Sequence, residues 1–255
     1  EAELFEMIDI GGPTMIRSAA KNFEDVIVLT NPNQYQNILE NLTKKNGSPL
    51  GITLENRRKL ALEAFERTSE YDLAISMELS RRINRNQIPT KIKISTEKGT
   101  KLRYGENPHQ LASFYPDTLH NGETGLSAIN QHSGKQLSFN NYLDLDGTLR
   151  ILRSLLTVCK EDKHGCVIVK HSNPSGVAVD NHQEKSWQNA LLSDPESAFG
   201  CVIGFTHTVT KITAEEIADH FFECVIAPDF EEEALKILSS KKNRRIISIK
   251  QLKPR

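Results

Sequence analysis

The segment VIVKHSNPSGVAV, residues 167–179, begins as a short β-branched apolar run and turns polar in its middle. A continuous apolar run that is closed by turn-forming residues predicts a strand buried inside a sheet. This strand ends in Lys170-His171, two side chains that carry protons. Because α/β sheets place their ligands at the carboxyl ends of strands, this position is the first candidate for a functional site.

Lys170 and His171 are chemically suited to proton transfer. A partly desolvated Lys exchanges protons near neutral pH, and His titrates there without any perturbation. Asn173-Pro174 and Gly176 predict a tight turn after the pair, which would offer backbone N–H groups to an anion. From composition alone, the more frequent alternative is a strand that simply ends in solvent with two polar residues.

Similar apolar runs on both sides of this segment predict further strands. The predicted strands are LASFYP, GCVIVK, FGCVIGF, ECVIAP and RRIISI, and most are separated by helical patterns at residues 141–159, 183–192, 213–222 and 230–240. Thr213 with Glu216 predicts a capping box that starts one helix. Continuous apolar strands that alternate with helices indicate an α/β sheet covered on both faces.

The amino-terminal part of the chain has a different pattern. DVIVLT at residues 25–30 predicts a buried strand, and residues 53–84 predict one long helix or two that meet near Ser69. KIKIS at residues 91–95 is typical of an edge strand. We therefore place a domain boundary near residues 86–98.

Composition excludes several classes of function. Lys and Arg number 32 against 33 Asp and Glu, so no excess of positive charge favours nucleic acid or an anionic membrane as a partner. No apolar run approaches the length of a membrane span, and the first residues are acidic. We expect a cytoplasmic protein. The cysteines lack metal-ligand spacing and predict four buried thiols, Cys159, Cys166, Cys201 and Cys224.

Further candidate sites lie in loops. RYGENPHQ, residues 103–110, offers an Arg fork suited to phosphate, although a surface hairpin loop is equally compatible with it. IDIGGPTMIRSAAK, residues 8–21, places Pro13 at the expected first position of a helix, where free N–H groups can bind an anion. An ordinary Gly-rich loop that starts a helix is the alternative.

Six motifs follow one another along the chain: IDIGGPTMIRSAAKN, LRYGENPHQ, LSFNNYLDLDG, VIVKHSNPSG, DPESAFG and FECVIAPDFEEEAL. In this order they resemble the bifunctional purine-biosynthesis family that joins IMP cyclohydrolase to AICAR transformylase. The motifs span essentially the whole chain, so the resemblance does not depend on any one of them.

The resemblance implies a parent chain about twice as long, with both ends missing here. Residues 1–95 would be the end of the cyclohydrolase, a methylglyoxal-synthase-like α/β domain, with its helical connection. Residues 96–255 would be the first half of the transformylase, a cytidine-deaminase-like layered α/β fold. The family further implies AICAR, FAICAR, IMP and folate as ligands, 10-formyltetrahydrofolate as co-substrate, a homodimer and no metal.

Catalytic roles also follow from the resemblance. Lys170 and His171 resemble the pair that manages protons when the 5-amino group of AICAR attacks the formyl carbon. In the first domain, Lys21 resembles the general acid/base of the ring closure that converts FAICAR to IMP with loss of water. Asp9 resembles a ligand-binding carboxylate of that domain.

The same resemblance implies an AICAR site in the second domain. Arg103 and Tyr104 resemble residues that bind AICAR, and Phe199 with Gly200 shapes the site by contact and by close backbone approach. Glu223 stands where the family has an AICAR-binding carboxylate, which is Asp in some members.

Two departures and two alternatives accompany this interpretation. Ser175 stands where many members have Cys, and Cys201 stands where we expect Gly and could crowd the backbone near the ligand. A zinc deaminase is disfavoured because NPSGV lacks the P-C-x-x-C ligands and no H-x-E precedes it. The more serious alternative is a non-catalytic fragment that only binds nucleotide or packs into an assembly.

Overall fold

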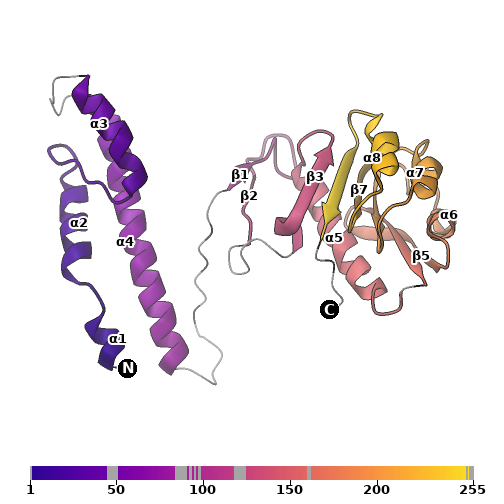
Figure 1. The fold of residues 1–255 in the computed structure, drawn as a ribbon, viewed down its shortest axis with the longest axis horizontal. Coiled ribbons are helices and arrows are strands. Elements are labelled where there is room, and N and C mark those ends of the chain that lie inside the picture. Colours follow the sequence, from indigo (N-terminus) through magenta and orange to yellow (C-terminus); the bar gives the residue numbers. More distant parts are fainter. Residues whose placement is uncertain are drawn as a thin grey trace. The chain divides into compact units, whose positions relative to one another are not determined.

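The computed structural model describes residues 2–44, 51–83, 99–117, 125–159 and 162–250, together with residues 91, 94, 96 and 252. The chain separates into two compact units, Glu1–Ile94 and Ser95–Arg255. Each unit has its own helices and its own core (Figure 1). The edge strand expected at residues 91–95 lies largely outside the described residues.

The described part of the first unit is helical. Its helices are α1 (Ala2–Glu6), α2 (Gly11–Lys21), α3 (Tyr35–Thr43) and α4 (Leu54–Ile83), with a 3-10 turn, η1, at Pro32–Gln34. α4 is one continuous helix of 30 residues, which decides between the one-helix and two-helix predictions. α2 packs against α4 through a small core, in which Ala20, Ala61 and Ala64 let the two backbones approach closely.

The strand predicted at residues 25–30 is not formed. Residues 26–30 are irregular and half-buried, and Val28 packs against the α2–α4 core. A strand needs a neighbouring strand for its backbone hydrogen bonds, and the described residues of this unit contain none. The β-branched side chains of this run therefore contribute packing alone.

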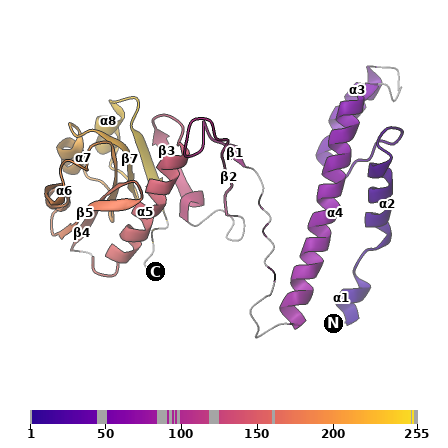
Figure 2. The same ribbon diagram turned by 180° about the vertical axis from the view of Figure 1, so that it is seen from behind.

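The second unit is built on a six-stranded sheet with the order β3-β8-β7-β6-β4-β5 (Figure 2). Its strands are β3 (Ile129–Ser133), β4 (His164–Lys170), β5 (Asn173–Asp180), β6 (Cys201–Phe205), β7 (Phe222–Ala227) and β8 (Arg245–Ile249). β6, β7 and β8 run parallel, β4 lies antiparallel between β5 and β6, and β3 lies antiparallel to β8. The unit is a mixed α/β fold, as the alternating pattern predicts.

Helices cover both faces of this sheet. One face carries α5 (Phe139–Leu155), and the other carries α6 (Gln183–Ser193), α7 (Lys211–Ile217) and α8 (Glu232–Ser239). The two cores share each central strand, because Val167 of β4 belongs to the core under α5 and Ile168 belongs to the opposite one. This explains why the central strands are mostly apolar on both faces.

The segment after Lys170 is a strand, so the prediction of a tight turn at Asn173-Pro174 and Gly176 is wrong. The turn consists of His171 and Ser172, whose φ angles are +52° and +64°, and β5 begins directly after it. Two adjacent residues in this region form the tight turn that suits a two-residue hairpin. β5 tolerates Pro174 because it lies at the edge of the sheet.

Two further predictions need correction. The helix predicted from residue 213 begins earlier, at Lys211, because the hydroxyl of Thr210 caps it by accepting from the backbone N–H of Thr213 at 3.2 Å. The strand predicted in LASFYP is reduced to β2 (Ser113–Phe114). It pairs with β1 (Thr100–Lys101) in a separate two-stranded sheet.

We expect the substitution Leu152→Ala to destabilise the second unit by about 2–5 kcal/mol, because it leaves a cavity under α5. Leu152 is fully buried, whereas Leu143 on the same helix is 42% exposed and serves as the control. Urea unfolding followed by the fluorescence of Trp187, the one tryptophan of the chain, measures the free energy of unfolding of this unit. Equal effects of Leu152→Ala and Leu143→Ala would contradict the assigned core.

Candidate functional site

The antiparallel insertion of β4 decides which strand ends lie together. The carboxyl end of β4 lies at the same edge of the sheet as the amino ends of β6, β7 and β8. Lys170 ends β4, Gly200 directly precedes β6, Glu223 is near the start of β7, and Arg245 starts β8. The candidate site is therefore at a mixed edge, and not at an edge formed by carboxyl ends alone.

Glu223 lies in a β-bulge. Cys201 pairs with Phe222 and Val202 pairs with Cys224, which leaves Glu223 as the extra residue of β7. Phe222 and Cys224 consequently enter opposite cores, although they are two residues apart. Bulges redirect side chains at sheet edges, and here the bulge leaves the carboxylate of Glu223 outside both cores.

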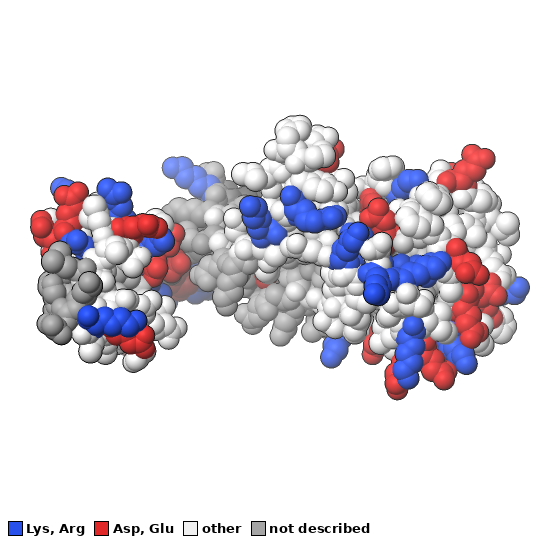
Figure 3. Space-filling model, turned by 90° about the horizontal axis from the view of Figure 1, so that it is seen from above, with Lys and Arg blue, Asp and Glu red and all other residues white. Residues whose placement is uncertain are grey.

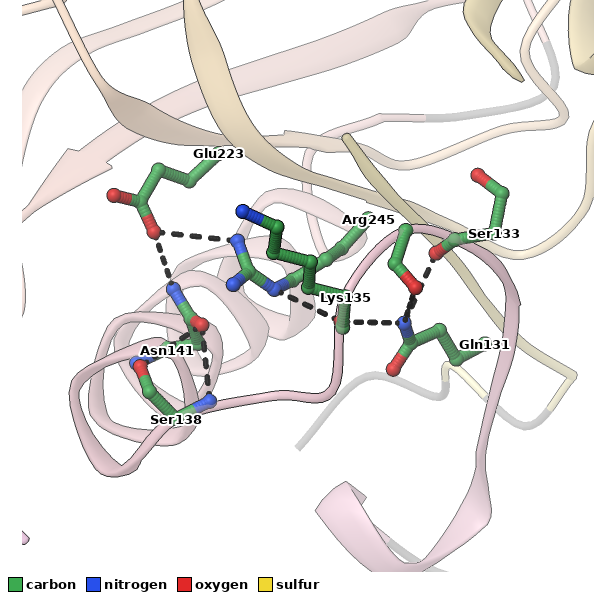
Figure 4. Close-up of polar contacts among 8 residues, drawn as sticks. Gln131, Ser133, Lys135, Ser138, Asn141, Glu223 and Arg245 are labelled. Carbon is green, nitrogen blue, oxygen red and sulfur yellow. Dashed lines mark hydrogen bonds and ion pairs between the residues drawn. The ribbon is translucent and has the colours of Figure 1, made fainter. Parts of the chain in front are cut away.

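Two buried side chains hold this carboxylate (Figure 4). Glu223 Oε2 accepts hydrogen bonds from Asn141 Nδ2 at 2.8 Å and from Arg245 Nη1 at 3.4 Å. Asn141 belongs to the capping box of α5, where its Oδ1 accepts from the backbone N–H of Ser138 at 3.0 Å. The first turn of α5 thereby orients the carboxylate.

Arg245 is itself fixed by the loop that precedes α5. Its Nε donates to the carbonyl oxygen of Lys135 at 3.1 Å, and Gln131 Nε2 donates to the same oxygen at 2.8 Å (Figure 4). The side chain of Arg245 is only 7% exposed. Asn141 and Arg245 are not among the residues predicted from the sequence, although the S-x-x-N spacing of Ser138 and Asn141 is a recognisable capping signal.

A cavity of about 590 Å³ lies against Glu223. It is also lined by Tyr104, Phe221 and a group of cationic side chains, namely Arg103, Lys135, Lys241, Lys242, Arg244 and Arg245. Figure 3 shows Lys and Arg side chains gathered on one face of the second unit. With Glu223 as the one carboxylate of the described lining, the cavity attracts anions.

Arg244 has an unused donor in this lining. Its guanidinium lies 4.3 Å from the centre of the Phe222 ring and donates from Nη2 to the carbonyl oxygens of Ala218 and His220. Its buried Nη1 donates to no acceptor in the described part of the chain. Burial lowers the pKa of Arg244, although an Arg stays charged under all physiological conditions.

Lys170 lies next to the cavity without lining it. Its Nζ donates to the carbonyl oxygen of Phe199 at 2.7 Å, and the Phe199 ring packs at a tilt of 30° against the Phe221 ring, with 4.6 Å between centroids. Gly200, at φ +72°, donates its N–H to the Phe221 carbonyl oxygen at 2.8 Å. Phe199 and Gly200 thus connect Lys170 to the cavity wall, whereas His171 lies exposed in the hairpin turn.

The cysteines are all free and buried, as predicted. Cys201 is fully buried in the core, where burial raises its pKa to about 12 and keeps the thiol neutral. Its side chain belongs to the core on the α6–α8 face of the sheet. Ser175 is the extra residue of a bulge in β5, with its hydroxyl 3.4 Å from the carbonyl oxygen of Ile168.

In the first unit, Asp9 and Lys21 lie at opposite ends of α2. The helix begins at Gly11, so Pro13 is its third residue and not its first. Asp9 Oδ1 accepts from the N–H of Gly12 at 2.9 Å, and this donor is therefore not free for an anion. Lys21 is exposed in the last turn, about 15 Å along the helix axis from Gly11.

The described residues offer neither a metal-binding cluster nor a helix suited to a membrane. Among these residues, no group of three or more His, Cys, Asp or Glu side chains is arranged to hold a metal ion. The described helices also include none that is long and apolar enough to cross a membrane.

Comparisons with known proteins identify relatives over nearly the whole length of the chain. A family model described as the AICARFT/IMPCHase bienzyme matches residues 19–255. The bifunctional purine biosynthesis protein PurH of Clostridium botulinum strain Hall is 40% identical over 249 residues, which are 98% of this chain and 47% of that protein. The PurH protein of Aquifex aeolicus is 40% identical over 97% of this chain and 46% of its own length. The chain spans about half the length of these curated relatives.

The excess of cations predicts that inorganic pyrophosphate binds the cavity. Replacing both Lys241 and Lys242 by Gln should weaken this binding roughly tenfold, because two charge-assisted contacts are lost. Calorimetric titration at low and high salt measures the effect, which should shrink as salt rises. Lys236→Gln is the matched control, because Lys236 pairs with Glu232 on α8 and does not line the cavity. Unchanged binding in the double variant would exclude the cavity as the anion site.

Proposed function

Because the chain belongs to the AICARFT/IMPCHase bienzyme family, we propose that its second unit carries the first half of an AICAR transformylase site. The reaction moves a formyl group from 10-formyltetrahydrofolate to the 5-amino group of AICAR, giving FAICAR. The observation that carries the proposal is the cationic cavity, whose oriented carboxylate Glu223 lies at the same sheet edge as Lys170.

In this proposal, the cavity holds the nucleotide. Its Lys and Arg side chains suit a phosphate group, which Arg can bind through two parallel hydrogen bonds. Glu223 accepts hydrogen bonds from ribose or amino groups, and its contacts with Asn141 and Arg245 keep it in one orientation. Arg103 and Tyr104 also line the cavity, and the Arg103 guanidinium lies 5.5 Å from the centre of the Tyr104 ring.

Lys170 and His171 manage the protons of the transfer. The aromatic amine attacks the formyl carbon, a C–N bond forms, and the bond from that carbon to the folate nitrogen breaks. The amine loses one proton and the folate nitrogen gains one, so an adjacent base and acid are both needed. The hydrogen bond from Lys170 Nζ to the Phe199 carbonyl oxygen supports a fixed position of the Lys170 side chain near the cavity wall.

The first unit belongs to the second activity in this proposal. Residues 1–95 form the end of a methylglyoxal-synthase-like cyclohydrolase domain, which closes the ring of FAICAR to give IMP and water. Lys21 acts as general acid/base and Asp9 binds the ligand. Residues 96–255 form a cytidine-deaminase-like half of the transformylase, and the complete protein works as a cytoplasmic homodimer.

The cationic cavity by itself supports a second candidate function, in which the chain binds a nucleotide without turning it over. In that case it is a non-catalytic nucleotide-binding or assembly module. Binding and turnover therefore have to be measured separately.

Replacing Arg103 by Ala should weaken AICAR binding to this chain at least tenfold, because a bidentate contact to an anion contributes about 1.5–3 kcal/mol. Isothermal titration calorimetry with AICAR measures the change. Arg150→Ala is the control, since Arg150 is exposed on α5, pairs with Asp146 and does not line the cavity. A folded chain that binds no AICAR would confine the function to the full-length protein.

Replacing Lys170 by Ala in the full-length protein should lower the formyl transfer rate at least a hundredfold, because proton transfer typically contributes about 10²–10⁴ in rate. Ring closure of added FAICAR should proceed at its original rate. Lys163→Ala, at the residue that directly precedes the other end of the same strand, is the control and should leave both rates unchanged. A parallel loss of both activities in Lys170→Ala would contradict two separate sites.

A further inference from the structure

The hairpin turn that carries His171 is conformationally unfavourable. His171 and Ser172 have φ angles of +52° and +64°, in the left-handed region where residues with a Cβ atom are disfavoured. Such a backbone persists only where surrounding contacts impose it. The contacts that impose it here consequently determine where Lys170 and His171 lie.

Three contacts hold this turn. Asp144 Oδ1 accepts a hydrogen bond from the backbone N–H of Ser172 at 2.7 Å. Gly147 lets the turn approach α5 closely, because a Cβ atom at this position would lie 3.0 Å from the carbonyl oxygen of Ser172. Asn173 Nδ2 donates to the carbonyl oxygen of His171 at 2.9 Å. Two of the three contacts come from α5.

The residues of α5 that make these contacts follow one another at intervals of three. Asn141 contacts Glu223, whereas Asp144 and Gly147 contact Ser172. Residues three apart lie on one face of a helix, about 4.5 Å apart along its axis. A single stripe of α5 thus sets the separation between the carboxylate at the cavity and the turn that follows Lys170.

We propose that Asp144 is a positioning residue for formyl transfer, which holds Lys170 and His171 at a fixed distance from the nucleotide by anchoring the turn to α5. The inference rests on the function proposed above for these two residues. Asp144 touches neither reacting group in this scheme. Its effect passes through the backbone of Ser172.

The electrostatic surroundings of Asp144 agree with an anchoring role. Burial raises the pKa of its carboxyl, and the N–H of Ser172 together with the nearby His171 acts in the opposite direction. Glu223 is the other charged group that acts on it, and it raises the pKa further. A neutral side chain of the same shape, such as Asn, can still accept the hydrogen bond from the Ser172 N–H.

The test compares Asp144→Asn, which keeps an acceptor at Oδ1, with Asp144→Ala, which removes it. In the full-length protein, Asp144→Ala should lower kcat for formyl transfer roughly tenfold to a hundredfold, because small misplacements of catalytic groups have effects of that size. The KM for AICAR should change less than about twofold, since the groups that bind the nucleotide are untouched. Asp144→Asn should stay within about threefold of the original kcat, because the acceptor for the Ser172 N–H is kept.

Two further variants keep the test decisive if Asp144→Ala fails to fold. Gly147→Ala presses on the Ser172 carbonyl from the same stripe and should lower kcat without altering the KM for AICAR. Asp146→Asn should change neither, because Asp146 is exposed on α5 and contacts Arg150. A kcat equal to the original in both Asp144→Ala and Gly147→Ala would overturn the proposal.

Hydrogen exchange distinguishes a failure of this proposal from a failure of the proposed function. Backbone amides of residues 168–176 should exchange at least about tenfold faster in Asp144→Ala than in Asp144→Asn, while the rest of the second unit stays protected. Faster exchange throughout the unit would mean a general folding role and would overturn the proposal. If the original protein shows no formyl transfer, the proposed function fails, and the exchange rates still decide whether Asp144 anchors the turn.

Discussion

The antiparallel pairing of β4 with β6 is the constraint on which the site depends. β4 is buried on both faces, so its register is fixed by two cores at once, with Val167 and Val169 on one side and Ile168 on the other. Its direction then places Lys170 beside the amino ends of the three parallel strands. A β4 parallel to β6 would carry Lys170 to the opposite edge, away from Glu223 and from the cationic cavity.

Local irregularities turn this regular edge into a site. The bulge at Glu223 takes one residue out of the alternation between the two cores and leaves its carboxylate at the cavity. The left-handed turn at His171 and Ser172 ends β4 and places Lys170 and His171 at the same edge of the sheet. Both irregularities are stabilised by α5, through Asn141 and Asp144, and this helix is anchored in the sheet by Leu145, Leu149 and Leu152. The core therefore holds the side chains of the candidate site in fixed positions.

The sequence predicts the parts of the fold that depend on burial and misses those that depend on pairing. β4, β6, β7 and β8 are recognisable because burial on two faces makes them mostly apolar. β3 and β5 are the edge strands, so their polar residues and Pro174 resemble a loop. The run at residues 25–30 has the composition of a strand, but no described strand of its unit pairs with it.

The same distinction applies to the site. Arg103, Tyr104 and Glu223 are found through the family resemblance, and the cavity contains all three. Asn141 and Arg245 were missed because their contacts with Glu223 span 82 and 22 residues, and no local pattern reports them. The cations of the cavity illustrate a second reason why part of the site could not be predicted from the sequence. Placing several of them around a single carboxylate stores electrostatic repulsion, which a bound anion relieves and thereby stabilises the unit. A sequence with balanced total charge conceals this concentration, because the sheet edge alone brings distant cations together.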